Sequence, residues 1–333
     1  MSASIWALPQ LTALLMGSSA TVANVEPPIV PQTPNLEAIA PDLADPETDI
    51  IDIEDDRTRR YTVPVTIEGA GPFDFMIDTG SQATAVTAQI NEGLQLTPFG
   101  TATLVAMAST RPVDVVEVDS ISFGNQTIHD LVSPVLDRKN VGADGILGLD
   151  SLQDFRVLID FREETIAIQD VTGMRNQKRG FEIVVRADRR LGQLLITEAR
   201  VEGVRATVII DTGAQSSLGN LALQRRLRTK RAQEVVTTDV NGVELTGDMS
   251  FVRSLNLGGL EMRNVPLTFA DAPAFAALGL QEEPVISLGM QHLRLFDRVA
   301  IDFANRRVLF DVPRDVARAL RRQRNRNFNA LAQ

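Results

Sequence analysis

The stretch FMIDTGS at residues 75–81 decides the fold of this chain, because the chain contains it twice. The second copy reads TVIIDTGA and spans residues 207–214. In both copies an apolar run typical of a buried strand ends in Asp-Thr-Gly, so the strand delivers a carboxylate to a tight turn. One such tripeptide would be weak evidence. Two copies in matching surroundings indicate a duplicated functional loop.

The surroundings of the two copies form an internal repeat. Each Asp is preceded by a strand pair, which predicts a hairpin whose second strand carries the Asp. The other landmarks occur in the same order in both halves, at offsets of 133 to 142 residues, and the two Asp residues are 133 residues apart. These landmarks are residues 61–71 and 194–203, 118–124 and 252–258, 144–152 and 285–293, and the closing hairpins 157–168 and 299–310. Because the period is too long for a solenoid, it predicts one small β domain duplicated into two lobes.

With these landmarks the chain resembles the aspartic peptidase superfamily over residues 59–311. It is most similar to exported bacterial proteases of the retropepsin-like type that carry both lobes in one chain. Ile146-Leu147-Gly148 fits the apolar-apolar-Gly element of that family, whereas Ser287-Leu288-Gly289 in the second lobe has one polar residue. The resemblance implies an all-β fold, a two-lobed pepsin/retropepsin-like closed barrel with few short helices.

The resemblance implies that Asp78 and Asp211 form a catalytic dyad. Two carboxylates about 3 Å apart cannot both ionise, so they share one proton. The ionised carboxylate activates water as a general base, and the protonated one polarises the scissile carbonyl and helps protonate the leaving amine. Both pKa values then belong to the pair. Asp160 and Asp302 also repeat, but they lie at the turns of the closing hairpins, and we interpret them as structural.

The rest of each loop is expected to support the dyad. By resemblance, the two threonines cross-brace the loops, and the two glycines leave room for the carboxylates. A serine hydroxyl is expected beside the Asp78 carboxylate, and an alanine at the matching place in the second lobe cannot supply one. These supporting residues are Thr79, Gly80, Ser81, Thr212, Gly213 and Ala214.

A flap hairpin is expected beyond each Asp loop, and its tip would contact the substrate. The first tip is expected within residues 104–110 and the second within residues 239–243. In the second, Asn-Gly predicts a two-residue hairpin turn. The expected flap residues are Ala106, Met107, Ala108, Val240, Asn241 and Gly242.

Composition excludes several other functions. A chain of 333 residues with 44% hydrophobic content can bury two domain cores. A net charge of −10 argues against nucleic acid as the main partner. The absence of Cys removes disulfides, thiol catalysis and thiolate metal sites. The two histidines, His129 and His292, lie too far apart in the repeat to suggest a metal site or a serine triad. We therefore expect no metal and no cofactor.

Outside the lobes, the sequence predicts a leader, a spacer, a linker and a tail. The apolar run at residues 5–16, followed by small residues, indicates a signal peptide and export to the periplasm or secretion. An uncleaved leader would instead tether the protein to a membrane, and an apolar leader on a cytoplasmic protein is the other alternative. The predicted parts are 1–23 (signal peptide), 24–56 (disordered spacer), 57–168 (N-terminal lobe), 169–190 (linker), 191–312 (C-terminal lobe) and 313–333 (basic helix or tail).

Three of these segments carry more specific predictions. Residues 24–56 contain six prolines, ten acidic residues and no Lys or Arg, which is typical of disorder. An inhibitory pro-segment is the alternative, but such segments tend to be basic. Residues 181–186 are predicted to form an extra strand that joins the lobes, and residues 221–234 a short helix.

Two functions of different classes fit the sequence. The first is an aspartic endopeptidase that hydrolyses proteins or peptides at a water between Asp78 and Asp211. The second is a catalytically silent scaffold that binds an extended peptide in the cleft, where a flap pairs with it as an added strand. Two intact Asp-Thr-Gly loops favour the first. In both, we expect a monomer whose lobes pair within one chain, and exchange of lobes between two chains would leave the chemistry unchanged.

Overall fold

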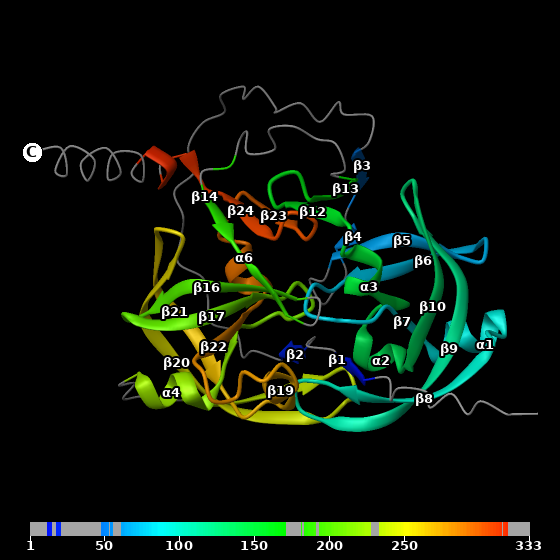
Figure 1. The fold of residues 1–333 in the computed structure, drawn as a ribbon, viewed down its shortest axis with the longest axis horizontal. Helices are drawn as coiled ribbons and strands as arrows, with labels where there is room; N and C mark the ends of the chain where they lie inside the picture. The colour runs from blue at the N-terminus through cyan, green and yellow to red at the C-terminus, as the bar shows by residue number, and fades with distance from the viewer. Residues whose placement is uncertain are drawn as a thin grey trace, which may run out of the picture.

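The computed structural model describes residues 12–14, 18–20, 48–52, 54–55, 61–170, 181, 183–190, 193–227, 233–314 and 316–318. Within these residues the chain forms two β lobes and a third sheet that joins them (Figure 1). Each lobe has a nine-stranded sheet, and the joining sheet has six strands. The fold is therefore mostly β and two-lobed, with short helices, as the repeat predicts. Among the described residues, no helix is long and apolar enough to cross a membrane.

The first lobe is a sheet that curls back on itself. Its elements are β4 (Glu54–Asp55), β5 (Tyr61–Ile67), β6 (Ala70–Ile77), β7 (Ala85–Thr87), α1 (Ala88–Leu94), β8 (Pro98–Val105), β9 (Thr110–Phe123), β10 (Gln126–Leu136), α2 (Arg138–Val141), β11 (Gly145–Leu147) and α3 (Leu149–Leu152). β6, which leads to Asp78, pairs in parallel with β11. An additional pairing of β5 with β9 brings the sheet back on itself, so β5, β6, β11, β7, β10 and β9 form a closed cycle of pairings.

The second lobe repeats this arrangement. Its elements are β15 (Asp188–Arg190), β16 (Gln193–Val201), β17 (Val204–Ile210), β18 (Leu218–Gly219), α4 (Leu221–Arg226), β19 (Gln233–Asp239), β20 (Glu244–Leu257), β21 (Leu260–Phe269), α5 (Pro273–Ala277), β22 (Val285–Leu288) and α6 (Met290–Leu293). β17, which leads to Asp211, pairs in parallel with β22. β16 pairs with β20 as β5 pairs with β9. The C-terminal parts of the long strands β9 and β20 have the same alternation of buried and accessible residues. The two lobes therefore share a pattern of side-chain burial as well as a sequence pattern.

The closing hairpins of the two lobes build the joining sheet. Its strand order is β14 (Ile183–Arg186), β24 (Arg307–Asp311), β23 (Arg298–Asp302), β12 (Phe155–Asp160), β13 (Thr165–Asp170) and β3 (Thr48–Asp52). β12 of the first lobe pairs directly with β23 of the second. Across this seam the buried Arg156 donates to Asp302 at 2.8 Å. Burial alone would raise the pKa of Asp302, but hydrogen bonds from Arg156, Arg307 and Asn305 outweigh it and lower that pKa.

One cluster of buried apolar side chains runs through the whole molecule. It includes Phe75 and Phe123 of the first lobe, Phe269 of the second and Phe310 of the joining sheet. All four are among the largest fully buried side chains. The lobes are therefore held together by a shared core as well as by the backbone pairing of the joining sheet.

Two short N-terminal strands add to the flap hairpins. The first flap is formed by β8 and β9, and the matching hairpin of the second lobe by β19 and β20. β1 (Thr12–Leu14) pairs in parallel with β8, and β2 (Ser18–Ala20) pairs antiparallel with β19 (Figure 1). Both strands fall within the stretch for which the sequence predicts a signal peptide. The first strand of each flap hairpin thus accepts an extended segment at its edge.

Several details differ from the sequence-based expectations. The stretch predicted to be a disordered spacer contains strands β3 and β4. The helix expected over 221–234 ends at Arg226, and residues 228–232 lie outside the described residues. The strand expected over 181–186 is present as β14, at one edge of the joining sheet. Most of the predicted basic tail also lies outside the described residues.

Candidate active site

Each Asp of the repeat lies at the end of a strand that is flanked by a parallel partner. Asp78 follows β6, and its amide donates to the carbonyl oxygen of Leu147 at 3.0 Å. Asp211 follows β17, and its amide donates to Leu288 O at 3.1 Å. Both Asp residues are fully buried. The strand pairs β6–β11 and β17–β22 therefore fix the backbone position of each Asp.

The two Asp loops are joined by reciprocal threonine hydrogen bonds. The Thr79 hydroxyl donates to Ile210 O at 2.8 Å, and the Thr212 hydroxyl donates to Ile77 O at 2.7 Å. The Thr79 amide donates to Thr212 Oγ1 at 3.0 Å, and the Thr212 amide donates to Thr79 Oγ1 at 3.3 Å. These buried bonds satisfy backbone groups of the opposite lobe, so they hold the loops in one relative position.

Gly213 brings the second loop against the carboxyl group of Asp78. A Cβ atom built on Gly213 would lie 2.3 Å from both Cγ and Oδ2 of Asp78, which is too close for any side chain. Asp78 Oδ1 accepts hydrogen bonds from the amides of Gly80 at 2.8 Å and Ser81 at 3.1 Å. The absence of a side chain at Gly213 is thus what allows the carboxyl group of one lobe to reach the loop of the other.

The Asp211 carboxylate is held through both of its oxygens. Oδ1 accepts a hydrogen bond from the Ala214 amide at 3.0 Å, and Oδ2 accepts one from the Ser287 hydroxyl at 2.6 Å. Burial raises the pKa of Asp211, and the hydrogen bonds from Ser287, Ala214 and Gly213 oppose that rise. In the sequence, Ser287 is only a departure from the family pattern, and nothing there places it in the site.

The Ser81 hydroxyl does not take the expected place beside Asp78. It donates to Ala83 O at 2.7 Å, and Ser81 contacts the Asp78 carboxylate through its backbone amide. A second contact that the sequence did not predict comes from Gln193, which is fully buried on β16. Its amide nitrogen donates to Gly80 O at 2.5 Å, so the second lobe also holds the first Asp loop through its glycine carbonyl.

In each lobe a pair of hydrogen-bonded side chains also contacts the Gly that follows the strand paired with the Asp strand. In the first lobe Thr84 contacts Ser151 and Asp150, and its hydroxyl accepts from the Gly148 amide at 3.1 Å. In the second lobe Ser217 lies 2.6 Å from Nδ1 of the buried His292, and its hydroxyl accepts from the Gly289 amide at 2.9 Å. Burial lowers the pKa of His292 to about 4. His292 is therefore a neutral structural partner near pH 7.

The flap tips meet each other. Residues 106–109 and 240–243 form the two turns, so the second turn has four residues rather than the two that Asn-Gly predicts. The Ser109 hydroxyl donates to Asp239 Oδ2 at 2.6 Å, and the Asn241 side chain donates to Ser109 Oγ at 2.8 Å. Gly242 has φ +75°, the left-handed conformation that glycine adopts readily. Of the six expected flap residues, Ala106, Met107, Val240 and Asn241 are buried, Ala108 is half-buried and Gly242 is exposed.

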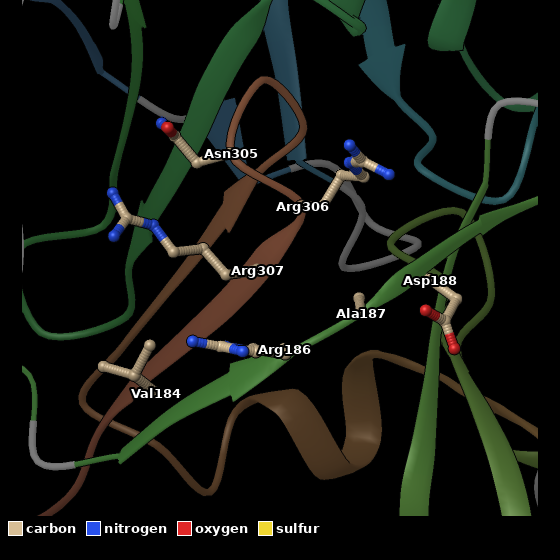
Figure 2. A pocket seen from close by; sticks show the side chains of 7 residues that line it. All are labelled: Val184, Arg186, Ala187, Asp188, Asn305, Arg306 and Arg307. Atoms are coloured by element: carbon tan, nitrogen blue, oxygen red, sulfur yellow. The ribbon is translucent and has the colours of Figure 1, made fainter.

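A cavity of about 440 Å³ lies away from the Asp loops. It is formed by β14 and the turn between β23 and β24 (Figure 2). Its arginines point to different sides in Figure 2 and do not converge on one point. Arg307 donates instead to Asp302 at 2.8 Å. The cavity lining is Val184, Arg186, Ala187, Asp188, Asn305, Arg306 and Arg307. The cavity therefore has no part in the chemistry of the two Asp residues.

In the part of the chain that the structure describes, no cluster of His, Cys, Asp or Glu could hold a metal ion.

Two lobes that each contribute an Asp-Thr-Gly loop to one buried, cross-braced site define a protein of the aspartic protease class. Comparison with known proteins agrees. A family model described as aspartyl protease matches residues 63–151 and again residues 197–291. These two matches contain the two Asp loops and together cover more than half of the chain, so the chain belongs to the aspartyl protease family. A search of curated proteins finds no match.

Proposed function

We propose that this protein is an aspartic endopeptidase in which a water molecule is activated between Asp78 and Asp211. The observation that carries the proposal is the reciprocal brace of Thr79 and Thr212. This brace brings two buried Asp loops from different lobes into one site. A scaffold that only binds peptides has no need of a second carboxylate at that place.

The mechanism follows from the shared proton. The ionised carboxylate removes a proton from water, and the water oxygen attacks the carbonyl carbon of the peptide bond. The protonated carboxyl group donates its proton to the carbonyl oxygen, which gives a tetrahedral diol. In the second step the amide nitrogen is protonated and the C–N bond breaks, which leaves a carboxylic acid and an amine. Because the two carboxyl groups titrate as a pair, neither role is assigned permanently to one Asp.

The substrate we propose is an extended peptide. β8 and β19, the first strands of the flap hairpins, already accept the N-terminal strands β1 and β2 at their edges. An extended peptide would use the same backbone donors and acceptors, which gives affinity without strict dependence on sequence. The flap-tip residues 106–108 and 240–242 would then contact its side chains.

Hydrolysis of a denatured protein mixture between pH 4 and 7.5 tests this proposal. The proteins compared are the wild type, Asp78→Asn and Asp211→Asn, each with and without pepstatin. Asp160→Asn is the matched control, because Asp160 caps a turn of the closing hairpin through the Arg162 and Glu163 amides, and asparagine can still accept those bonds. We expect activity in the wild type and Asp160→Asn, and none in the two dyad variants.

Other outcomes would discriminate among the alternatives. Equal activity in all four proteins would indicate a contaminant and remove the dyad. A folded wild type without activity on any peptide, but with measurable peptide binding, would favour the silent scaffold.

We further propose that the protein is exported and acts as a monomer. The support for export is the apolar run at residues 5–16 followed by small residues. N-terminal sequencing of the protein from the periplasm or the medium should give a chain that begins after Ala20 or Ala23. The support for a monomer is that each Asp loop already has its partner loop in the same chain. Light scattering after size exclusion should give the mass of one chain.

A further inference from the structure

Ser287 occupies a position that is apolar in the other lobe. In the first lobe β11 pairs with β6 so that Ile146 lies opposite Met76, two residues before Asp78. In the second lobe β22 pairs with β17 so that Ser287 lies opposite Ile209, two residues before Asp211. Ile146 and Ser287 are therefore equivalent, and both are fully buried. Ile146 packs into an apolar cluster, whereas the Ser287 hydroxyl donates to Asp211.

The Ser287 hydrogen bond has the character of a strong one. Its 2.6 Å length lies in the range of hydroxyl donors to an ionised carboxylate. A hydroxyl donor stabilises the charged form of a buried carboxylate, which burial otherwise disfavours. The neighbouring position in the Asp loop is Ala214, whose side chain has no hydroxyl. Ser287 thus supplies from β22 a donor that the second Asp loop itself lacks.

We propose that Ser287 is a positioning residue of the dyad, whose hydroxyl holds the Asp211 carboxylate in one orientation and stabilises its ionised form. The proposal rests on the function proposed above and deepens it. It makes the two lobes chemically unequal, since the first lobe has Ile146 at this place.

Two other titratable groups lie close to this site. Asp78 faces the second loop across Gly213 and, in the proposed dyad, shares a proton with Asp211. His292 on α6 hydrogen-bonds Ser217 rather than Asp211. Both groups are unchanged by a substitution at Ser287. A difference between the wild type and a Ser287 variant therefore reports the Ser287 hydroxyl.

The experiment compares Ser287→Ala with Ser287→Thr in the full chain. Loss of the hydroxyl should raise the lower apparent pKa of the dyad, which moves the acidic limb of the kcat/KM profile to higher pH by about one unit. Ser287→Thr keeps a hydroxyl, and its β-branched side chain suits a strand position that is Ile146 in the other lobe. It should therefore keep the wild-type limb. Ser133→Ala, which removes a buried hydroxyl from β10, is the control and should leave the limb unchanged.

A second readout does not depend on activity. The proteins are labelled with ¹³C at the Asp carboxyl groups, the Asp211 signal is assigned by its loss in Asp211→Asn, and its titration is followed by NMR. The proposal predicts an upward shift in Ser287→Ala and none in Ser133→Ala. Equal titration of Asp211 in the wild type and Ser287→Ala would overturn it, as would a loss of activity at all pH values without movement of the limb.

The two proposals can fail separately. If the wild type hydrolyses no peptide but the Asp211 titration shifts in Ser287→Ala, the peptidase function fails and the role of Ser287 stands. If Ser287→Ala does not fold, Ser287→Cys preserves the size with a weaker donor and should give a smaller shift in the same direction. An unshifted Asp211 titration in Ser287→Cys and Ser287→Thr alike would then overturn the role of Ser287.

Discussion

Gly213 is the position at which the two Asp loops come closest. In Gly213→Ala the added Cβ would meet the Asp78 carboxyl group at 2.3 Å, so that group would have to turn away from the second loop. Because a displacement of about 1 Å can cost about 100-fold in rate, we expect kcat/KM to fall by at least about that factor. The measurement is peptide hydrolysis at the pH optimum. Gly93→Ala in α1 is the control, since its Cβ would meet nothing within 4 Å. Equal activity of both variants would contradict the close approach.

His292 makes stability depend on pH. Its pKa is about 4 in the folded protein and 6.5 in a model peptide, so the unfolded chain binds more protons between these values. The stability contribution is therefore complete above pH 6.5 and is lost as the pH falls toward 4, by about 3 kcal/mol in total. Urea unfolding of His292→Asn should show a flatter pH dependence in this window than the wild type. His129→Asn, at an exposed site, should behave as the wild type, and a His292→Asn profile with the wild-type slope would contradict the account.

The sequence predicted some site residues and missed others for a physical reason. The Asp-Thr-Gly loops are continuous in sequence, so a motif reveals them. Ser287 and Gln193 reach these loops from β22 and β16, and only the fold shows what they touch. The single signal for Ser287 was a polar residue where the matching element of the first lobe has Ile146. That signal indicates a buried hydroxyl that needs an acceptor, but the sequence does not show which group accepts.

At the scale of elements, the flap hairpins are coupled through Ser109. Its hydroxyl connects the β8–β9 turn to Asp239 and Asn241 of the other lobe. We expect Ser109→Ala to loosen both turns, because a hydrogen bond contributes about 1 kcal/mol and two are lost here. Hydrogen exchange should become faster in residues 106–109 and 240–243, and KM should rise. Ser122→Ala, farther along β9, is the control. Unchanged exchange at both turns in Ser109→Ala would show that the Ser109 hydroxyl does not couple the tips.

The elements that the sequence missed are those with little apolar patterning. β3 and β4 lie in an acidic, proline-rich segment whose composition predicts disorder. β3 pairs with β13 and β4 pairs with β5, and both partners are predicted strands. Backbone hydrogen bonds to an existing strand therefore order β3 and β4, which have little apolar sequence of their own. The closing hairpins were predicted one by one. Their assembly into one sheet across the lobes depends on tertiary pairing, which a local pattern does not encode.

At the scale of the whole molecule, β1 and β2 place the N-terminal segment on the flap edges of both lobes. A tethered segment competes with substrate at an effective concentration on the order of millimolar. We therefore expect a chain that begins at residue 24, which keeps β3 and β4, to have a KM lower by on the order of tenfold. Steady-state hydrolysis of one peptide by both chains measures this. Equal KM values would show that a substrate does not use these edges.

The central claim is that Asp78 and Asp211, in loops 133 residues apart, act as one unit. A double-mutant cycle tests it most directly, with kcat/KM measured for the wild type, Asp78→Asn, Asp211→Asn and the double variant on one peptide. Residues that act as a unit show non-additive losses. The account predicts that each single variant loses as much activity as the double variant. Losses that multiply in the double variant, or a single variant that keeps substantial activity, would contradict a shared dyad.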